Sequence, residues 1–135
     1  HRRIARAWLR FYADHRDLLL FGAHRVLSAD AHHSQFVVHR GGEALWGVFT
    51  SPFPGCLQLP GPGIRRAWIL NGSAQTQLFT RLEGVEGRGL AVAVCDRELA
   101  PAGATRVAVA AGRAVLDLQV PIGGALRVEL EGAGG

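Results

Sequence analysis

Apolar and aromatic side chains recur every three or four residues near the start of the chain, and this spacing predicts a helix. The residues of the repeating face are Ile4, Trp8, Phe11, Tyr12, His15, Leu18 and Leu19. Arginine and aspartate occupy the opposite side. Gly22 follows as the expected C-cap, because glycine readily adopts the left-handed conformation that ends many helices. We therefore expect one α-helix within residues 1–22.

From residue 24 the pattern changes to short apolar runs separated by glycine and proline, as in β-strands. The runs cover residues 24–28, 35–40, 43–49, 56–60, 65–71, 90–95, 105–111, 114–120 and 125–131. Gly41-Gly42 separates two of them and fits a two-residue hairpin turn. In the last two runs, apolar residues alternate with polar ones, which is typical of antiparallel strands with one buried face.

These elements predict a mainly β protein, an antiparallel β-sandwich of about eight strands preceded by one N-terminal α-helix. Residues 1–22 would form the helix and residues 23–135 the sandwich. A chain of 135 residues is long enough to bury one ordinary core. Residues 73–89 stay unassigned, because their sequence fits a strand or a loop.

Composition excludes several classes of protein. The formal charge is +4, and all 15 basic residues are arginine, but they are interleaved with acidic residues and accompany no nucleic-acid-binding motif. No apolar run reaches the roughly 18–20 residues that a membrane span needs, and the basic N-terminus lacks the apolar segment of a signal peptide. Cys56 and Cys95 have no metal-type spacing, which favours a reducing, cytoplasmic setting. Whether these two cysteines pair is left open.

A search for catalytic or metal-binding residues finds none. Glu83 and Glu86 are the only close pair of carboxylates in a loop-like stretch, where solvated side chains are the usual case. The histidines between residues 24 and 39 lack metal-ligand spacing, and His32-His33 falls in a polar stretch. No phosphate-binding loop or nucleophile motif is present, so we expect no catalytic residue, no metal and no cofactor.

Three aromatic residues are candidates for stacking on a sugar ring. Trp46 and Trp68 lie inside apolar strand runs, where core packing is the more common role. Phe53 stands between two prolines in a loop and is the better candidate for exposure.

The junction between helix and first strand follows the pattern W-x-x-F-Y-x-x-H-R-x-L-L, then a glycine and an R-V-L strand. It resembles the end of the catalytic barrel and the start of the C-terminal β-domain in melibiase-type α-galactosidases. The stretches QFVVHRGGEALWGVFT, CLQLPGPGIRRAWILNG and LDLQVPIGGALRVEL resemble the strand pairs of that domain. The residues that carry the junction are Trp8, Phe11, Tyr12, His15, Arg16, Asp17, Leu18, Leu19, Gly22, Arg25 and Leu27.

The resemblance implies that the helix is the last helix of a catalytic barrel, and that Trp8, Phe11 and Tyr12 lie at the barrel interface. The two catalytic aspartates of that family precede this helix, so the chain alone would be inactive. We therefore expect a non-catalytic accessory β-domain that stabilises the barrel or an oligomer of the parent glycoside hydrolase. An independent carbohydrate-binding β-sandwich is the alternative, with Phe53, Trp46 or Trp68 contacting the sugar.

Overall fold

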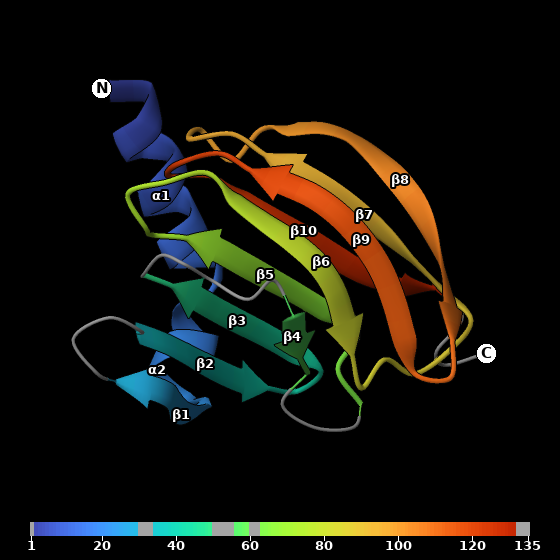
Figure 1. Cartoon of the computed structure of the whole chain (residues 1–135). Helices are drawn as coiled ribbons and strands as arrows, with labels where there is room; N and C mark the ends of the chain where they lie inside the picture. The colour runs from blue at the N-terminus through green and yellow to red at the C-terminus, as the bar shows by residue number, and fades with distance from the viewer. Residues whose placement is uncertain (1, 30–33, 50–55, 60–62, 132–135) are drawn as a thin grey trace.

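The structure is a computed structural model that describes residues 2–29, 34–49, 56–59 and 63–131. It contains the helices α1 (Arg2–Asp14) and α2 (Arg16–Phe21), followed by strands only (Figure 1). The strands are β1 (Ala23–Ala29), β2 (Ser34–Arg40), β3 (Glu43–Val48), β4 (Cys56–Gln58), β5 (Arg66–Asn71), β6 (Gln77–Glu83), β7 (Gly89–Cys95), β8 (Pro101–Ala110), β9 (Arg113–Val120) and β10 (Ala125–Glu131).

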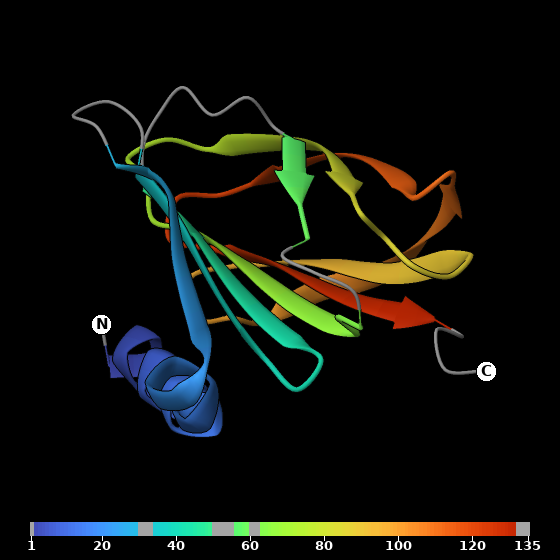
Figure 2. The same cartoon turned by 90° about the horizontal axis from the view of Figure 1, so that it is seen from below.

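The strands form one strongly curled sheet, like half of a barrel, and the chain is mainly β as expected. Its order is β1-β2-β3-β5-β10-β7-β8-β9-β6-β4. Figure 2 shows how the sheet folds over, so that β4, β6 and β9 face β2, β3 and β5. The finer expectation of an antiparallel sandwich of about eight strands is wrong, because ten strands belong to a single mixed sheet.

The mixed character comes from the path of the chain around β4. After β3 the chain crosses to the far half of the sheet, where β4 pairs in parallel with β6. It then returns as β5, which lies parallel to β3. Parallel neighbours need such a crossover. The apolar pattern predicts each of these strands but contains no signal for its direction or its partner.

The inner core lies between the two halves of the curled sheet. Trp46 on β3 and Ile69 on β5 pack in the same cluster as Phe79 and Leu82 on β6. Strands β2 and β3 also bury residues on their outer face, where Val38 joins a second cluster. Because both faces are covered, these strands are apolar at consecutive positions.

The N-terminal helical region is divided at His15 into two helices, where we expected one. Phe11 and Leu18 are buried against the outer face of the sheet, in the cluster that contains Val38 and Leu45. Gly22 is the C-cap, and its N–H donates to the Leu18 carbonyl at 2.9 Å. Its backbone is extended (φ −72°, ψ 164°) and not left-handed. Glycine is needed there because a Cβ atom would collide with that carbonyl and with the Val38 side chain.

Residues 73–89, which the sequence pattern left unassigned, contain the strand β6. Gln77–Glu83 pairs with β9 on one side and β4 on the other. Before it, Asn71 and Ser73 are buried polar residues with hydrogen bonds to one another. Polar residues therefore enter the core here, which is why the apolar pattern did not identify the strand.

Candidate functional site

The break between α1 and α2 positions the His15 side chain. Its backbone N–H donates to the Phe11 carbonyl (3.0 Å), and Nδ1 lies 2.8 Å from the same oxygen. A carbonyl only accepts hydrogen bonds, so Nδ1 carries a proton and Nε2 can accept or donate elsewhere. The ring stacks on Phe11, with centroids 4.2 Å apart, and meets Trp68 edge-on at 6.0 Å. These contacts hold the imidazole in one orientation.

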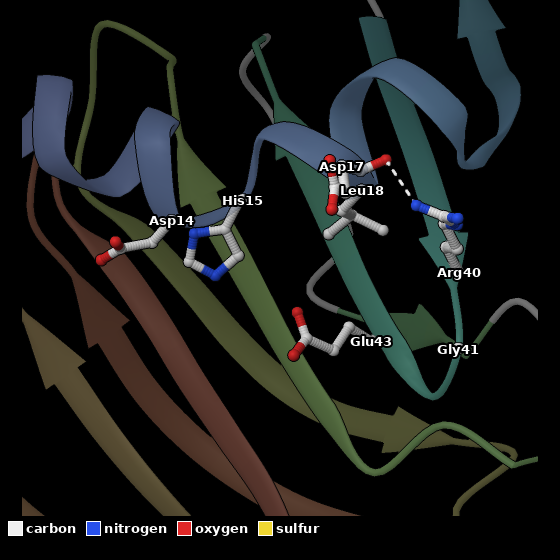
Figure 3. Close-up of a pocket in the computed structure, with 7 residues that line it drawn as sticks. All are labelled: Asp14, His15, Asp17, Leu18, Arg40, Gly41 and Glu43. Atoms are coloured by element: carbon white, nitrogen blue, oxygen red, sulfur yellow. Dashed lines mark hydrogen bonds between the residues drawn. The ribbon is translucent and has the colours of Figure 1, made fainter.

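A cavity of about 450 Å³ lies between the helices and the β2–β3 hairpin (Figure 3). Asp14, His15 and Asp17 line its helix side, and Arg40 and Glu43 line its hairpin side. Arg40 Nη1 donates to the Asp17 carbonyl at 3.4 Å, which links the two sides. Glu43 extends its carboxylate toward the side of the cavity where His15 lies (Figure 3). The cavity therefore places an imidazole, three carboxylates and one guanidinium around a shared space.

A second cavity of about 250 Å³ lies beside the first, and Asp14 and His15 line both. It adds the half-buried Trp68 together with Arg10, Glu98 and Leu99. We call the two cavities together the helix–sheet groove. One end of the groove is rich in charge, and the other end has an aromatic and aliphatic wall.

Hydrogen-bonding groups in the groove have capacity for a ligand. Within the described part of the chain, the carboxylates of Asp14 and Asp17 form no ion pair and no hydrogen bond. Glu43 pairs with Arg66 through one oxygen at 3.6 Å, which leaves its second oxygen for other donors. Carboxylate oxygens accept hydrogen bonds, whereas the Arg10 and Arg40 guanidinium groups only donate them.

The three residues expected at a barrel interface face different surroundings. Phe11 is buried and meets Trp68 edge-on, with centroids 5.0 Å apart. Trp8 is half-buried, and its Nε1 donates to the Arg97 carbonyl at 2.9 Å. Tyr12 is 53% exposed. Phe11 and Trp8 therefore contact the sheet of this chain, and Tyr12 points outward.

The three aromatic sugar-stacking candidates also differ. Trp46 is only 4% exposed, and its Nε1 donates to Gln35 Oε1 at 3.2 Å beside a cavity of about 240 Å³. Trp68 is half-buried and lines the helix–sheet groove. Phe53 lies outside the described residues. Both tryptophans therefore line cavities that contain polar and charged side chains, and Trp68 is the more exposed of the two.

The remaining acidic candidates have structural partners, and the two cysteines are not joined to each other. Glu83 pairs with Arg113 at 2.8 Å, and Glu86 accepts a hydrogen bond from the Gly63 N–H at 2.8 Å. Cys56 and Cys95 are free thiols, so they form no disulfide. Among the residues that the structure describes, no group of three histidine, cysteine or acidic side chains is placed to hold a metal ion. His32 and His33 lie outside that part.

The groove residues His15, Arg40 and Glu43 were not identified as a site from the sequence, because nothing in their local pattern indicates that the helix packs over this hairpin.

No helix in the described ranges is long and apolar enough to cross a membrane. No family model, curated protein or solved structure matches this chain.

Proposed function

We propose that this chain is the non-catalytic C-terminal accessory β-domain of a glycoside hydrolase of the α-galactosidase type. It packs on the catalytic barrel of the same parent chain and stabilises it. The observation that carries the proposal is an N-terminal helical region with two apolar sides. Phe11 and Leu18 are buried on the sheet, while four large apolar residues are exposed: Leu9, Tyr12, Leu20 and Phe21, at 69, 53, 53 and 67%.

Leu9 and Tyr12 form a docking face on α1. Leu9 and Tyr12 are three residues apart and are neighbours on the surface of α1, with Ala5 one turn before Leu9. Exposed apolar residues that gather in this way are typical of surfaces that contact another protein or domain. A helix between two bodies needs two apolar sides, which is the arrangement that the resemblance to a barrel–sandwich junction implies.

Arginines border the docking face and indicate the chemistry of its partner. Arg2 stands seven residues before Leu9, and Arg6 lies one turn after Arg2, so both flank the apolar side chains of the docking face. Both arginines are exposed. The partner surface would therefore be apolar at its centre and carry carboxylates at its rim.

The test compares this chain with the longer chain encoded together with its upstream sequence. We expect the longer chain to hydrolyse a chromogenic α-galactoside and residues 1–135 alone to show no hydrolysis. In the longer chain, L9E/Y12E should shorten the half-life of activity on heating, because two charges enter the interface. V115E is the matched control, since Val115 is 60% exposed on β9, away from the helices.

Three outcomes would overturn the proposal. Hydrolysis by residues 1–135 alone would show that the chain is itself catalytic, and Glu83 and Glu86 would then be mutated first. Equal half-lives for L9E/Y12E and V115E would show that the docking face contacts nothing in the parent enzyme. If the isolated chain dimerises and L9E/Y12E abolishes the dimer, the face is a contact between copies.

An independent carbohydrate-binding module is the second candidate function. The position of Trp68 in the helix–sheet groove favours it, whereas Trp46 belongs to the core. The two functions use different parts of the molecule, so one does not exclude the other.

A further inference from the structure

We infer that a cavity between the two free edges of the curled sheet binds a small monocarboxylate with an apolar body. Among the described strands, β1 and β4 stand at the two ends of the sheet order, and each pairs on one side only. The cavity of about 240 Å³ beside Trp46 is lined from both edges, by Arg25 on β1 and by Cys56 and Gln58 on β4. We call it the edge cavity. Small molecules often bind in the mouths of β-barrels, which this opening resembles.

Strand register places Arg25 on the face of the sheet that forms the inner core. Arg25 pairs with Val37 across β1 and β2, and Val37 pairs with Trp46 across β2 and β3. Paired residues of neighbouring strands project from the same face. Val37 and Trp46 belong to the inner core cluster, whereas Arg25 is exposed because the sheet ends at β1. A guanidinium group therefore stands at the rim of a cavity with an apolar floor.

Arg25 gives the edge cavity a positive charge. It is the one charged residue among the described residues that line the cavity. Within the described part of the chain, its guanidinium forms no ion pair and no side-chain hydrogen bond. Its N–H donors are therefore available to a ligand, and their planar fork matches the two oxygens of a carboxylate. The same charge repels a cation.

The buried walls of the edge cavity require a ligand with an apolar body. Val37, Trp46 and Leu59 are buried residues of this wall. The Trp46 Nε1 already donates to Gln35 Oε1 at 3.2 Å, so the indole offers an apolar surface and no donor. A hydrated ion such as phosphate would leave this surface unused, whereas a hydrocarbon ring or chain would cover it and remove it from water.

Two amide side chains complete the polar rim. The Oε1 of Gln35 accepts from Trp46, so the Nε2 group of Gln35 remains a donor. Gln58 is exposed at the β4 edge and supplies a second amide. A carboxylate can accept several hydrogen bonds, so these amides can donate to it together with Arg25. The rim can therefore recognise a carboxylate from more than one side.

The size of the edge cavity limits the ligand to a single ring or a short chain. Its volume of about 240 Å³ is below the roughly 300–1,000 Å³ that is usual for drug-sized ligands. Benzoate, phenylacetate and hexanoate each combine one carboxylate with an apolar body of this size.

The test is a titration of residues 1–135 with these three carboxylates by isothermal calorimetry. Benzamide is the neutral probe with the shape of benzoate, benzylamine is the cationic probe, and inorganic phosphate is the anion without an apolar body. We expect saturable binding of at least one carboxylate. The other three probes should bind about tenfold more weakly or not at all, because each lacks the charge or the apolar body.

Two reporters place the ligand in the edge cavity. The variant W8F/W68F retains Trp46 as its one tryptophan, so its emission should change on binding. Cys56 lines the cavity and is partly exposed, whereas Cys95 is fully buried. A saturating carboxylate should therefore slow the alkylation of Cys56 by iodoacetamide, measured by mass spectrometry.

Charge variants test the role of Arg25. Arg25→Gln keeps a polar side chain but loses the charge, and should weaken carboxylate binding about tenfold. The matched control is Arg88→Gln, since Arg88 is also exposed but lies between β6 and β7 and does not line the cavity. The L9E/Y12E variant should bind the carboxylate as the unmodified chain does, which separates this inference from the docking proposal.

The inference is overturned if none of the three carboxylates binds, or if benzamide, benzylamine or phosphate binds as tightly as the best of them. Equal loss of affinity in Arg25→Gln and Arg88→Gln would also overturn it, because the effect would then come from net charge. Binding that changes neither Trp46 emission nor Cys56 alkylation would place the ligand outside the edge cavity and contradict the inference. Circular dichroism of each variant checks that the fold is retained.

Discussion

Asn71 shows how one buried polar side chain can organise two connections of the sheet. It is 1% exposed, and its Nδ2 lies 2.9–3.1 Å from the carbonyl oxygens of Gln75, Val120 and Pro121. Its Oδ1 accepts hydrogen bonds from the N–H and the hydroxyl of Ser73. The side chain thereby joins the β5–β6 connection to the end of β9. Buried polar groups are tolerated in this way only when they are hydrogen bonded.

Replacing Asn71 with alanine should lower the free energy of unfolding by about 2–4 kcal/mol, because several buried carbonyl and hydroxyl groups lose their partner. Urea unfolding followed by circular dichroism measures the change. Gln119→Ala is the control, since Gln119 is exposed on β9 and should change stability by less than about 0.5 kcal/mol. Equal losses in the two variants would contradict the role given to Asn71.

Ionisation of the Cys95 thiol should lower the stability of the folded protein at alkaline pH. Burial raises the pKa of the Cys95 thiol, which outweighs the lowering effect of Arg127, and Asp96 raises the pKa further. In the unfolded chain the thiol ionises near its ordinary pKa of about 8.5. The folded protein therefore binds more protons above that pH, and the stabilisation present below pH 8.5 is lost as pH rises toward the folded pKa.

We expect the free energy of unfolding to fall between pH 8 and 10, with a contribution from Cys95 of at most about 1.4 kcal/mol per pH unit. Urea unfolding in the presence of a reducing agent measures it. The variant Cys95→Ala should show a shallower decline over the same range. A decline of the same slope in both proteins would assign the pH dependence to other groups.

The helix α1 has one side buried on the sheet and one side exposed. Phe11 and Tyr12 are adjacent in sequence, yet Phe11 is 8% exposed and Tyr12 is 53% exposed. The difference follows from the helical period, which turns successive side chains by about 100°. Packing of Phe11 on Trp68 therefore fixes α1 on the sheet, whereas Tyr12 remains available to a partner.

Alanine substitutions at these two neighbours should differ in their effect on the stability of the isolated chain. Phe11→Ala should lower the free energy of unfolding by about 3–4 kcal/mol, because a buried ring is replaced by a cavity. Tyr12→Ala should change it by less than about 0.5 kcal/mol in the isolated chain. Hydrogen exchange of α1 and urea unfolding test the pair. A large loss for Tyr12→Ala would show that this ring already packs within the chain.

For the molecule as a whole, the curled sheet means that residues distant in sequence share one core. Leu57 on β4 and Leu82 on β6 are fully buried in the same cluster as Trp46 on β3. The outer cluster beneath the helices shares the strands β2, β3 and β5 with that core. The two clusters are built on the same strands. The folding of the helices and of the two halves of the sheet should therefore be coupled.

We expect thermal unfolding to be a single cooperative transition in which far-UV circular dichroism and tryptophan fluorescence coincide. Trp46 reports on the inner cluster, whereas Trp8 and Trp68 report on the outer one, so W46F isolates the outer signal and W8F/W68F isolates the inner one. An early fluorescence transition seen in W46F but not in W8F/W68F would show that the helices leave the sheet before the rest unfolds.

Local sequence patterns were sufficient to predict most of the elements. Alternating or continuous apolar runs identify strands because a side-chain period of two, or burial on both faces, is visible within six or seven residues. Gly41-Gly42, with φ of +58° and +89°, forms the expected hairpin turn. The predicted helix also formed, but its break at His15 has no signal in the apolar spacing.

The groove could be predicted only in part. Trp68 was a candidate because aromatic side chains are recognisable by type. His15 and Glu43 were not paired, because they are 28 residues apart and meet only when the helices pack over the β2–β3 hairpin.

The sequence by itself determined the mainly β class, the N-terminal helical segment and most strand positions, since these depend on interactions between neighbouring residues. Only the tertiary structure decided that ten strands form one curled sheet with the pairs β3–β5 and β4–β6 parallel. It also decided which aromatic rings are buried and which charged groups line the groove. The physical reason is that strand pairing and helix docking depend on contacts between distant residues, which no local period records.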